Sequence, residues 1–212
     1  MHAERTSVLS DSLRDSLSSP LSYSAGMNVH TESLSPRDRL LAVASALFYA
    51  EGIKGVGVDR ILAEAGVTRA TMYRHFAGKE DLVAAYLGRE DEIIRNYFAA
   101  AETAGGSAAD LLVAVIDGIA EDARRYHRRG CPFINAAAEY PDGEIREVID
   151  RHRAWFRQRL GAVCKAAGIP NANQAAAALV LLRDAALVGV YLDGDAVTTT
   201  FRRTARQVVG LS

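Results

Sequence analysis

The segment that decides the fold spans residues 61–82 and reads ILAEAGVTRATMYRHFAGKEDL. Its first half has a helical pattern that reaches Gly66, and glycine commonly ends a helix because it adopts the left-handed conformation without strain. Thr68 follows two residues later and is a favoured N-cap, so the spacing predicts a short helix over residues 69–75 or 69–76. Lys79 then begins a further helix. A helix, a glycine turn and a capped short helix make up a helix-turn-helix, whose second helix enters the major groove of DNA.

The short helix is expected to have an apolar and a polar side. The apolar residues that can hold it against the preceding helix are Ile61, Ala65, Val67, Met72 and Phe76. The residues left to face outward are Arg69, Ala70, Thr71, Tyr73, Arg74 and His75. Arginine can donate two hydrogen bonds to guanine, and threonine can read a base edge, so the polar side is a candidate DNA-reading surface. Ordinary helical hairpins, in which Gly66 and Thr68 only end and begin helices, are the alternative for this spacing taken alone.

The sequence on both sides of this segment predicts an all-helical chain. Ser35 can cap a helix whose first residue is Pro36 and which Gly52 ends. Glycines and prolines divide the remaining sequence, and no alternating strand pattern occurs. The predicted helices cover parts of residues 36–51, 58–65, 69–76, 79–104, 107–126, 132–139, 142–167, 172–192 and 195–209.

Composition restricts the kind of DNA binding and the compartment. Charged residues make up 24% of the 212 residues and sum to a net charge of −1, so any DNA binding has to be local. Cys131 and Cys164 have neither the spacing of a zinc site nor that of a disulfide framework, which fits a reducing cytosol. The N-terminus lacks the continuous apolar core of a signal peptide, and we expect a cytoplasmic protein.

One apolar stretch, residues 175–192, is long enough to suggest a membrane span. Arg183 and Asp184 lie at its middle, and each would cost about 2.5–3.5 kcal/mol at the centre of a bilayer. The stretch therefore favours a buried helix of a soluble protein, with no membrane partner.

The region 36–82 resembles the N-terminal DNA-binding domain of the TetR family of transcriptional regulators. The resemblance rests on the elements Ala-Gly-Val, Thr, Tyr, His-Phe and Lys-Glu-Asp-Leu, which fall in register within residues 65–82. It implies that the bases are faced by Thr68, Arg69, Ala70 and Thr71, and that the DNA backbone is contacted by Tyr73, His75 and Lys79. Arg37 and Arg74 complete the predicted DNA-binding set.

Three segments are predicted along the chain. Residues 1–34 are rich in serine and lack sustained periodicity, which predicts a disordered tail. Whether residues 1–26 belong to the native product stays open, because Met27 is a second candidate start. Residues 35–82 form the predicted DNA-binding domain, and residues 83–212 form a helical effector-binding and dimerisation domain, joined to it by the long helix that begins at Lys79.

The resemblance extends to the helical layout of residues 107–210 and implies a bundle that binds a small-molecule effector. Ligand pockets are mostly apolar with a few polar groups, so aromatic residues near helix breaks are candidates for the lining. These candidates are Tyr126, Phe133, Asn135, Tyr140, Trp155, Phe156 and Tyr191. Core packing is the alternative for each of them. Cys131 also has two interpretations, core packing or a reactive thiolate favoured by a helix N-terminus.

The last two helices, about 174–209, combine small and large apolar residues and suit a homodimer interface. A dimer would place two recognition helices about 34–36 Å apart, in successive major grooves of a palindromic operator. We therefore predict a repressor that binds double-stranded operator DNA and is released by an effector. A ligand-independent DNA-binding or protein-interaction module is the alternative. We expect no enzyme, metal or cofactor, because no nucleophile, acid-base pair, metal cluster or phosphate-binding loop has a persuasive spacing.

Overall fold

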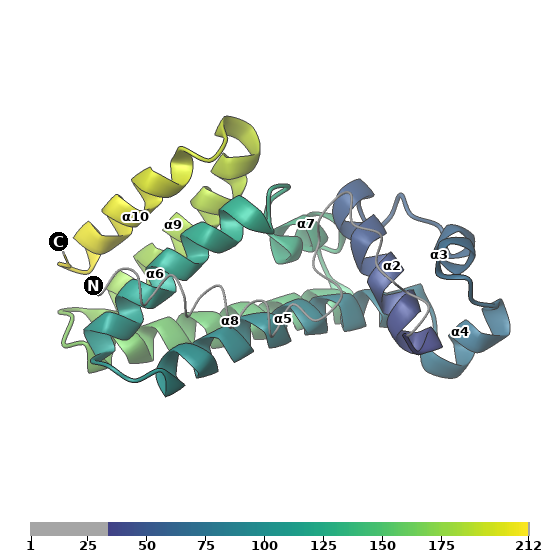
Figure 1. The fold of residues 1–212 in the computed structure, drawn as a ribbon, viewed down its shortest axis with the longest axis horizontal. Helices are drawn as coiled ribbons and strands as arrows, with labels where there is room; N and C mark the ends of the chain where they lie inside the picture. The colour runs from purple at the N-terminus through teal and green to yellow at the C-terminus, as the bar shows by residue number, and fades with distance from the viewer. Residues whose placement is uncertain (1–33, 212) are drawn as a thin grey trace. The chain divides into compact units, whose positions relative to one another are not determined.

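The structure, a computed structural model, describes residues 34–211, and the predicted tail 1–34 lies outside the described residues except for its last position. The described chain contains nine helices and no strand, which confirms the predicted all-helical fold (Figure 1). The helices are α2 (Pro36–Glu51), α3 (Val58–Ala65), α4 (Arg69–His75), α5 (Lys79–Thr103), α6 (Ala108–Arg125), α7 (Pro132–Glu139), α8 (Gly143–Ala166), α9 (Ala172–Asp193) and α10 (Val197–Val208). Every predicted helix is present, with ends close to those predicted.

The described residues form two compact units. The N-terminal unit comprises residues 34–92 and 132–150, and the C-terminal unit comprises residues 93–131 and 151–211. The N-terminal unit therefore contains α7 and the start of α8, which come from the second half of the chain. The functional division predicted from the sequence, 35–82 and 83–212, remains a prediction.

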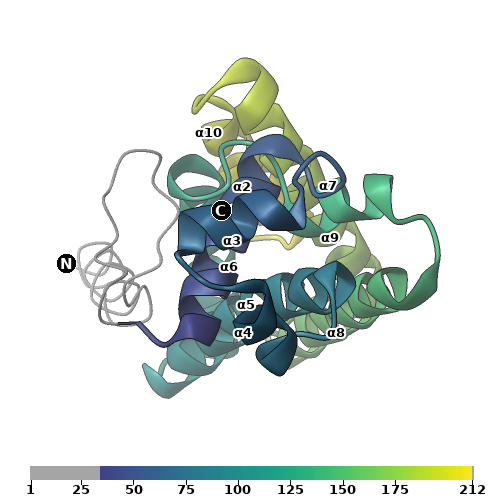
Figure 2. The ribbon, with the colours of Figure 1, turned by 90° about the vertical axis from the view of Figure 1, so that its right-hand side faces the viewer.

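Figure 2 shows the helices α2, α3 and α4 of the N-terminal unit, and local capping explains where they begin and end. Pro36 is the first residue of α2, and the Oγ of Ser35 accepts a hydrogen bond from the backbone of Asp38 at 3.2 Å. Gly66 ends α3 in the left-handed conformation, with φ 62° and ψ 38°. Thr68 caps α4 by accepting a hydrogen bond from the backbone of Thr71 at 3.2 Å. These caps are those that the sequence predicts.

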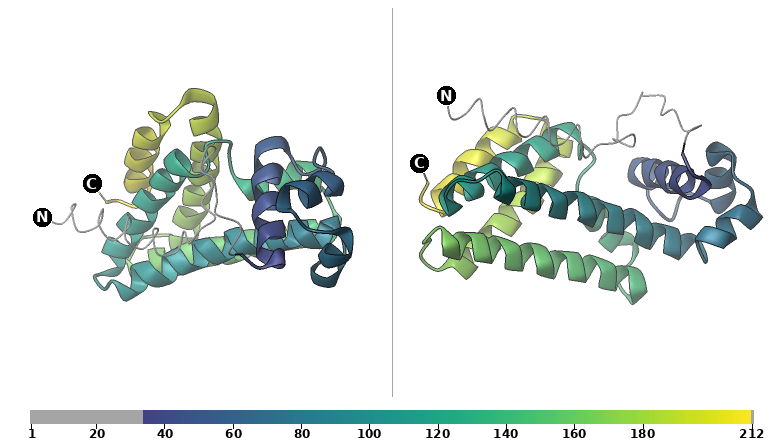
Figure 3. Two further views of the ribbon diagram at one scale, coloured as in Figure 1. Left: turned by 45° about the vertical axis from the view of Figure 1, so that its right-hand side comes forward. Right: turned by 60° about the horizontal axis from the view of Figure 1, so that its bottom comes forward.

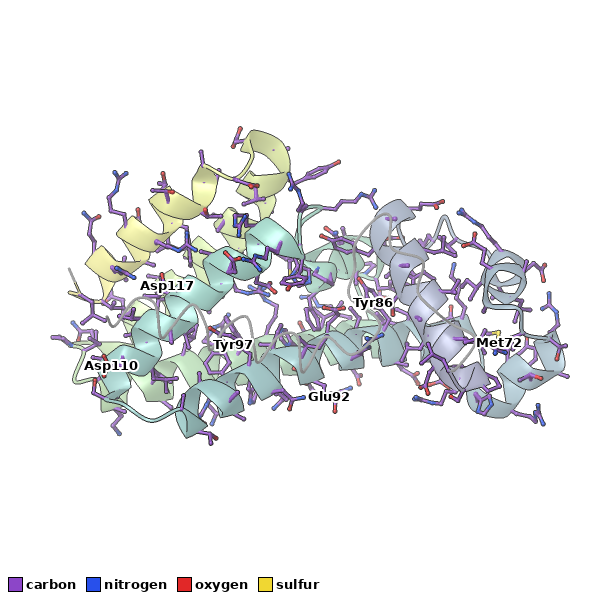
Figure 4. The ribbon with its side chains drawn as sticks, in the orientation of Figure 1. Met72, Tyr86, Glu92, Tyr97, Asp110 and Asp117 are labelled. Atoms are coloured by element: carbon purple, nitrogen blue, oxygen red, sulfur yellow. The ribbon has the colours of Figure 1, made fainter. Side chains whose placement is uncertain are left out.

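The core of the N-terminal unit is built from one apolar face of each helix. The rings of Phe48 in α2 and Tyr86 in α5 lie 6.0 Å apart between centroids, and Met72 of α4 is fully buried (Figure 4). Glu139, the last residue of α7, ties this helix to the connection between α2 and α3 within the same unit. Its carboxylate accepts hydrogen bonds from the backbone N–H groups of Ile53 at 2.8 Å and Lys54 at 2.5 Å.

In the C-terminal unit α6, α9 and α10 pack against one another (Figure 3). The C-terminal parts of α5 and α8 complete its core, with Phe98 and Leu160 among the buried residues. The Oη of Tyr97, in the C-terminal part of α5, donates a hydrogen bond to the carbonyl oxygen of Ala114 in α6 at 2.8 Å (Figure 4). Gly118 faces the ring of Tyr97 one turn further along α6, where a Cβ atom would overlap with that ring. The packing of the Tyr97 ring against α6 therefore requires glycine at this position.

Helix α9 is long and apolar enough to cross a membrane by length and composition alone. Arg183 lies near its middle and is buried, as are Ala176, Leu179 and Ala186 of the same helix. A buried core helix passes the same test, and the buried arginine fits a core helix.

Candidate nucleic-acid interface

The apolar side of the helix-turn-helix is packed as predicted. Ile61 and Met72 are fully buried, and Ala65, Val67 and Phe76 are between 2% and 9% exposed. These residues fix α4 against α3, since each large side chain buried in this way contributes about 1.5–3 kcal/mol. The orientation of the short helix is therefore set by its buried side and by the Gly66 turn.

The opposite side of α4 is open to solvent. The side chains of Arg69, Arg74 and His75 are exposed, and Tyr73 is 54% exposed. Thr71 is half-buried rather than fully outward. Its hydroxyl lies 2.9 Å from that of Thr68 and also accepts a hydrogen bond from the Nη2 of Arg74 at 3.0 Å.

The remaining predicted DNA-contact residues lie at helix starts or caps. Arg37 is in the first turn of α2, with a half-exposed side chain whose guanidinium lies 5.3 Å from the centroid of the Phe76 ring. Thr68 and Ala70 are exposed at the start of α4, and Lys79 is the half-buried first residue of α5. All nine predicted contact residues therefore belong to the N-terminal unit.

The charges on α3 are arranged differently from those on α4. The Arg60 guanidinium donates hydrogen bonds to Glu51 at 2.5 and 2.8 Å and to Glu64 at 2.8 Å, and these carboxylates raise its pKa. Arg69 of α4 pairs with Asp59 of α3. Helix α4 itself carries two arginines and a histidine and no acidic residue, so positive charge is concentrated on the exposed helix.

The C-terminal unit contains a buried charged group that sequence reasoning did not place in a site. The Arg183 side chain is 8% exposed, and its Nη1 lies 3.1 Å from the Oδ1 of Asp184 and 3.5 Å from the Sγ of Cys131. Arg153 donates to the other oxygen of Asp184 at 2.8 Å. Burial opposes the charge of Arg183, but Cys131 and Asp184 raise its pKa, so the guanidinium stays charged. The only sequence signal was an Arg-Asp pair inside an apolar helix.

The predicted effector-contact residues are divided between the two units. Trp155 and Phe156 cluster with Phe98, whose ring centroid lies 5.7 and 5.9 Å from theirs. His152, which was not predicted, is buried and stacks on Phe156, with 6.1 Å between the ring centroids. The other candidates are Tyr126, half-buried at the end of α6; Phe133, buried in α7; Asn135 and Tyr140, half-buried in or just after α7; and Tyr191, 58% exposed on α9. Phe133, Asn135 and Tyr140 belong to the N-terminal unit.

The described residues are helical, with a packed helix-turn-helix whose second helix, α4, has one side exposed to solvent. This architecture is typical of DNA-binding transcriptional regulators. The model of the family described as bacterial regulatory proteins, tetR family, matches residues 40–86. The crystal structure of SCO4454, a TetR-family transcriptional regulator from Streptomyces coelicolor, is 42% identical, with a TM-score of 0.79 over 82% of this chain and 94% of that one. This chain belongs to the TetR family of transcriptional regulators.

Two further relatives show how the similarity is distributed. A TetR transcriptional regulator from Chloroflexus aurantiacus shares the fold, with a TM-score of 0.71 and 23% identity over 82% of this chain and 94% of that one. An HTH-type transcriptional regulator of Staphylococcus aureus (strain USA300) is 36% identical over 62 residues, which are 29% of this chain. That match spans 34% of the curated relative's length.

Proposed function

We propose that this protein binds palindromic operator DNA in the cytoplasm as a homodimer and represses transcription until a small molecule bound to its C-terminal helices releases it. The observation that carries the proposal is the exposed polar side of α4, whose opposite side is locked in the core by Met72. Arg69, Thr71 and Arg74 supply donors for base edges and phosphates. Tyr73, His75 and Lys79 supply further donors for the DNA backbone.

Selection of duplexes from random DNA by the full chain tests the proposal. The expected product is an inverted repeat bound with an affinity that falls steeply with salt. Arg69→Ala is expected to lower discrimination between bases at one base pair in each half-site, by about 1–3 kcal/mol. Lys79→Ala is expected to weaken binding to all sequences and to reduce the salt slope by about 1. Equal affinity for operator and unrelated DNA would refute operator binding.

The dimer is proposed from the outward side of α9. Leu181 and Leu192 are each 69% exposed, and Val188 is 41% exposed. The spacing of 7 and 4 residues places all three on one face of the helix, together with the small residues Ala177 and Ala185. Large apolar residues exposed in a row mark interaction surfaces, and a second copy of the same face would bury them symmetrically.

Sedimentation of a Leu181 variant tests the dimer. Leu181→Glu is expected to shift the protein from dimer to monomer, because the interface would bury two unpaired carboxylates. Ala162→Glu, on the exposed side of α8, introduces the same charge and serves as the control. A Leu181→Glu protein that stays dimeric would place the interface elsewhere.

Effector release is proposed from the polar groups in the C-terminal core. Buried His152 and Arg183 lie against the ring of Phe156, with the Arg183 guanidinium 5.1 Å from the ring centroid. A mixture of rings and a few buried polar groups is typical of ligand sites. An effector has to bind the released state more tightly than the DNA-bound state. Compounds that raise the melting temperature should therefore weaken operator binding, and a stabilising compound that leaves operator affinity unchanged would argue against this mechanism.

A further inference from the structure

The arginine most suited to read a base, Arg69, is already in contact with a carboxylate. Its Nη2 donates to the Oδ1 of Asp59, which lies in the first turn of α3, on the other helix of the helix-turn-helix. Both side chains are solvent-exposed, 53% for Arg69 and 84% for Asp59. An exposed pair of this kind contributes little to folding, so stability gives little reason for it.

The pair restricts how Arg69 can approach DNA. A guanidinium has five N–H donors in one rigid plane. The contact with Asp59 uses the Nη2 group, at one edge of that plane. The other donors remain available for the two acceptors of a guanine. A free arginine side chain loses much conformational freedom when it binds, and one that is already held in place loses less.

The second arginine of α4 is held in a comparable way by a neutral group. Arg74 donates to the hydroxyl of Thr71, which in turn lies against the hydroxyl of Thr68. Asp59, the partner of Arg69, therefore differs from Thr71, the partner of Arg74, in carrying a negative charge. A carboxylate beside DNA repels the phosphates and lowers affinity for every sequence alike. It is favourable only where Arg69 meets a base with the geometry that the pair imposes.

We propose that Asp59 is a positioning residue for sequence recognition, which orients Arg69 toward a guanine and lowers binding to unrelated DNA. This inference rests on the proposed operator binding. It assigns Asp59 no contact with a base: the carboxylate acts through the guanidinium that it holds. Removing its charge should therefore reduce discrimination while raising affinity for non-operator DNA.

Binding of the full chain to three duplexes tests the inference: the selected operator, an operator changed at the base pair that Arg69→Ala ceases to discriminate, and an unrelated sequence. Asp59→Asn keeps the size of the side chain and removes its charge. We expect discrimination at that base pair to fall about fivefold or more, within the range for a bidentate contact, and affinity for the unrelated duplex to rise. In an Arg69→Ala background, Asp59→Asn should leave discrimination unchanged.

Glu64→Gln is the matched control, because it removes the same charge from the same helix at a residue that pairs with Arg60 instead. It is expected to raise affinity for all three duplexes without changing their ratios. Asp59→Asn with parental discrimination would overturn the inference. Improved discrimination by Asp59→Asn would also overturn it, because Asp59 would then keep Arg69 away from DNA. An equal loss of discrimination from Asp59→Asn in the Arg69→Ala background would overturn it too, because the effect would not depend on Arg69. A parent protein that selects no sequence would instead refute operator binding itself.

Discussion

Replacing Glu139 by alanine should release the connection between α2 and α3 from α7. The carboxylate of Glu139 accepts two backbone hydrogen bonds, from the part-buried N–H of Ile53 and from the exposed N–H of Lys54. A hydrogen bond to a charged group contributes about 1.5–3 kcal/mol. Water can replace the carboxylate at Lys54, so we count the Ile53 bond in full and expect a loss of about 2 kcal/mol.

Hydrogen exchange measured at the two amides tests this value directly. A loss of about 2 kcal/mol in the free energy of local opening corresponds to exchange about 30-fold faster at Ile53. Glu139→Gln retains an acceptor oxygen and should give a smaller increase. Glu144→Ala, at an exposed glutamate in the first turn of α8, is the control and should leave both amides as in the parent. Unchanged exchange at Ile53 in Glu139→Ala would show that the carboxylate does not hold this connection.

Three further substitutions test the packing and charge of the two units. Gly118→Ala should lower the free energy of unfolding by about 1–3 kcal/mol, since its Cβ would overlap with the ring of Tyr97. Ser45→Ala should raise it by about 1 kcal/mol, because the Ser45 hydroxyl is buried without a hydrogen-bond partner among the described residues and alanine is the better helix former. Burial opposes the charge of Glu121, but the hydrogen bond from Arg124 and the surrounding arginine charges lower its pKa below 4.5. The stabilisation from Glu121 is therefore present above pH 4.5 and lost as the pH falls through the lowered pKa, so the stability difference between parent and Glu121→Gln should shrink in acid.

Urea denaturation measures all three effects, the last as a series from neutral pH to about pH 3. A Gly118→Ala protein as stable as the parent would mean that the Tyr97 ring moves away from α6 without loss. Lower stability in Ser45→Ala would indicate a role for the hydroxyl that the structure does not show. A stability difference for Glu121→Gln that stays constant in acid would contradict the lowered pKa.

The helix-turn-helix was predictable because its signals act over a few residues. Gly66 ends α3 and Thr68 caps α4 through contacts within the same short segment, and both act as the sequence predicts. The buried and exposed sides of α4 follow from helical periodicity, apart from Thr71, which neighbouring side chains partly cover. The effector-contact candidates could not be grouped in this way, because their distances depend on how helices far apart in the sequence pack.

The sequence by itself determined the helices, their caps and the exposed residues of α4, because propensity, capping and periodicity are local properties. Tertiary structure alone decided which polar groups of different elements meet. Glu139 reaches Ile53 across 86 residues, and Arg183 reaches Cys131 across 52. Even the shorter separation of 10 residues between Asp59 and Arg69 crosses from one helix to the next. A side chain's partner on another helix depends on the packing of both helices, which no local pattern specifies.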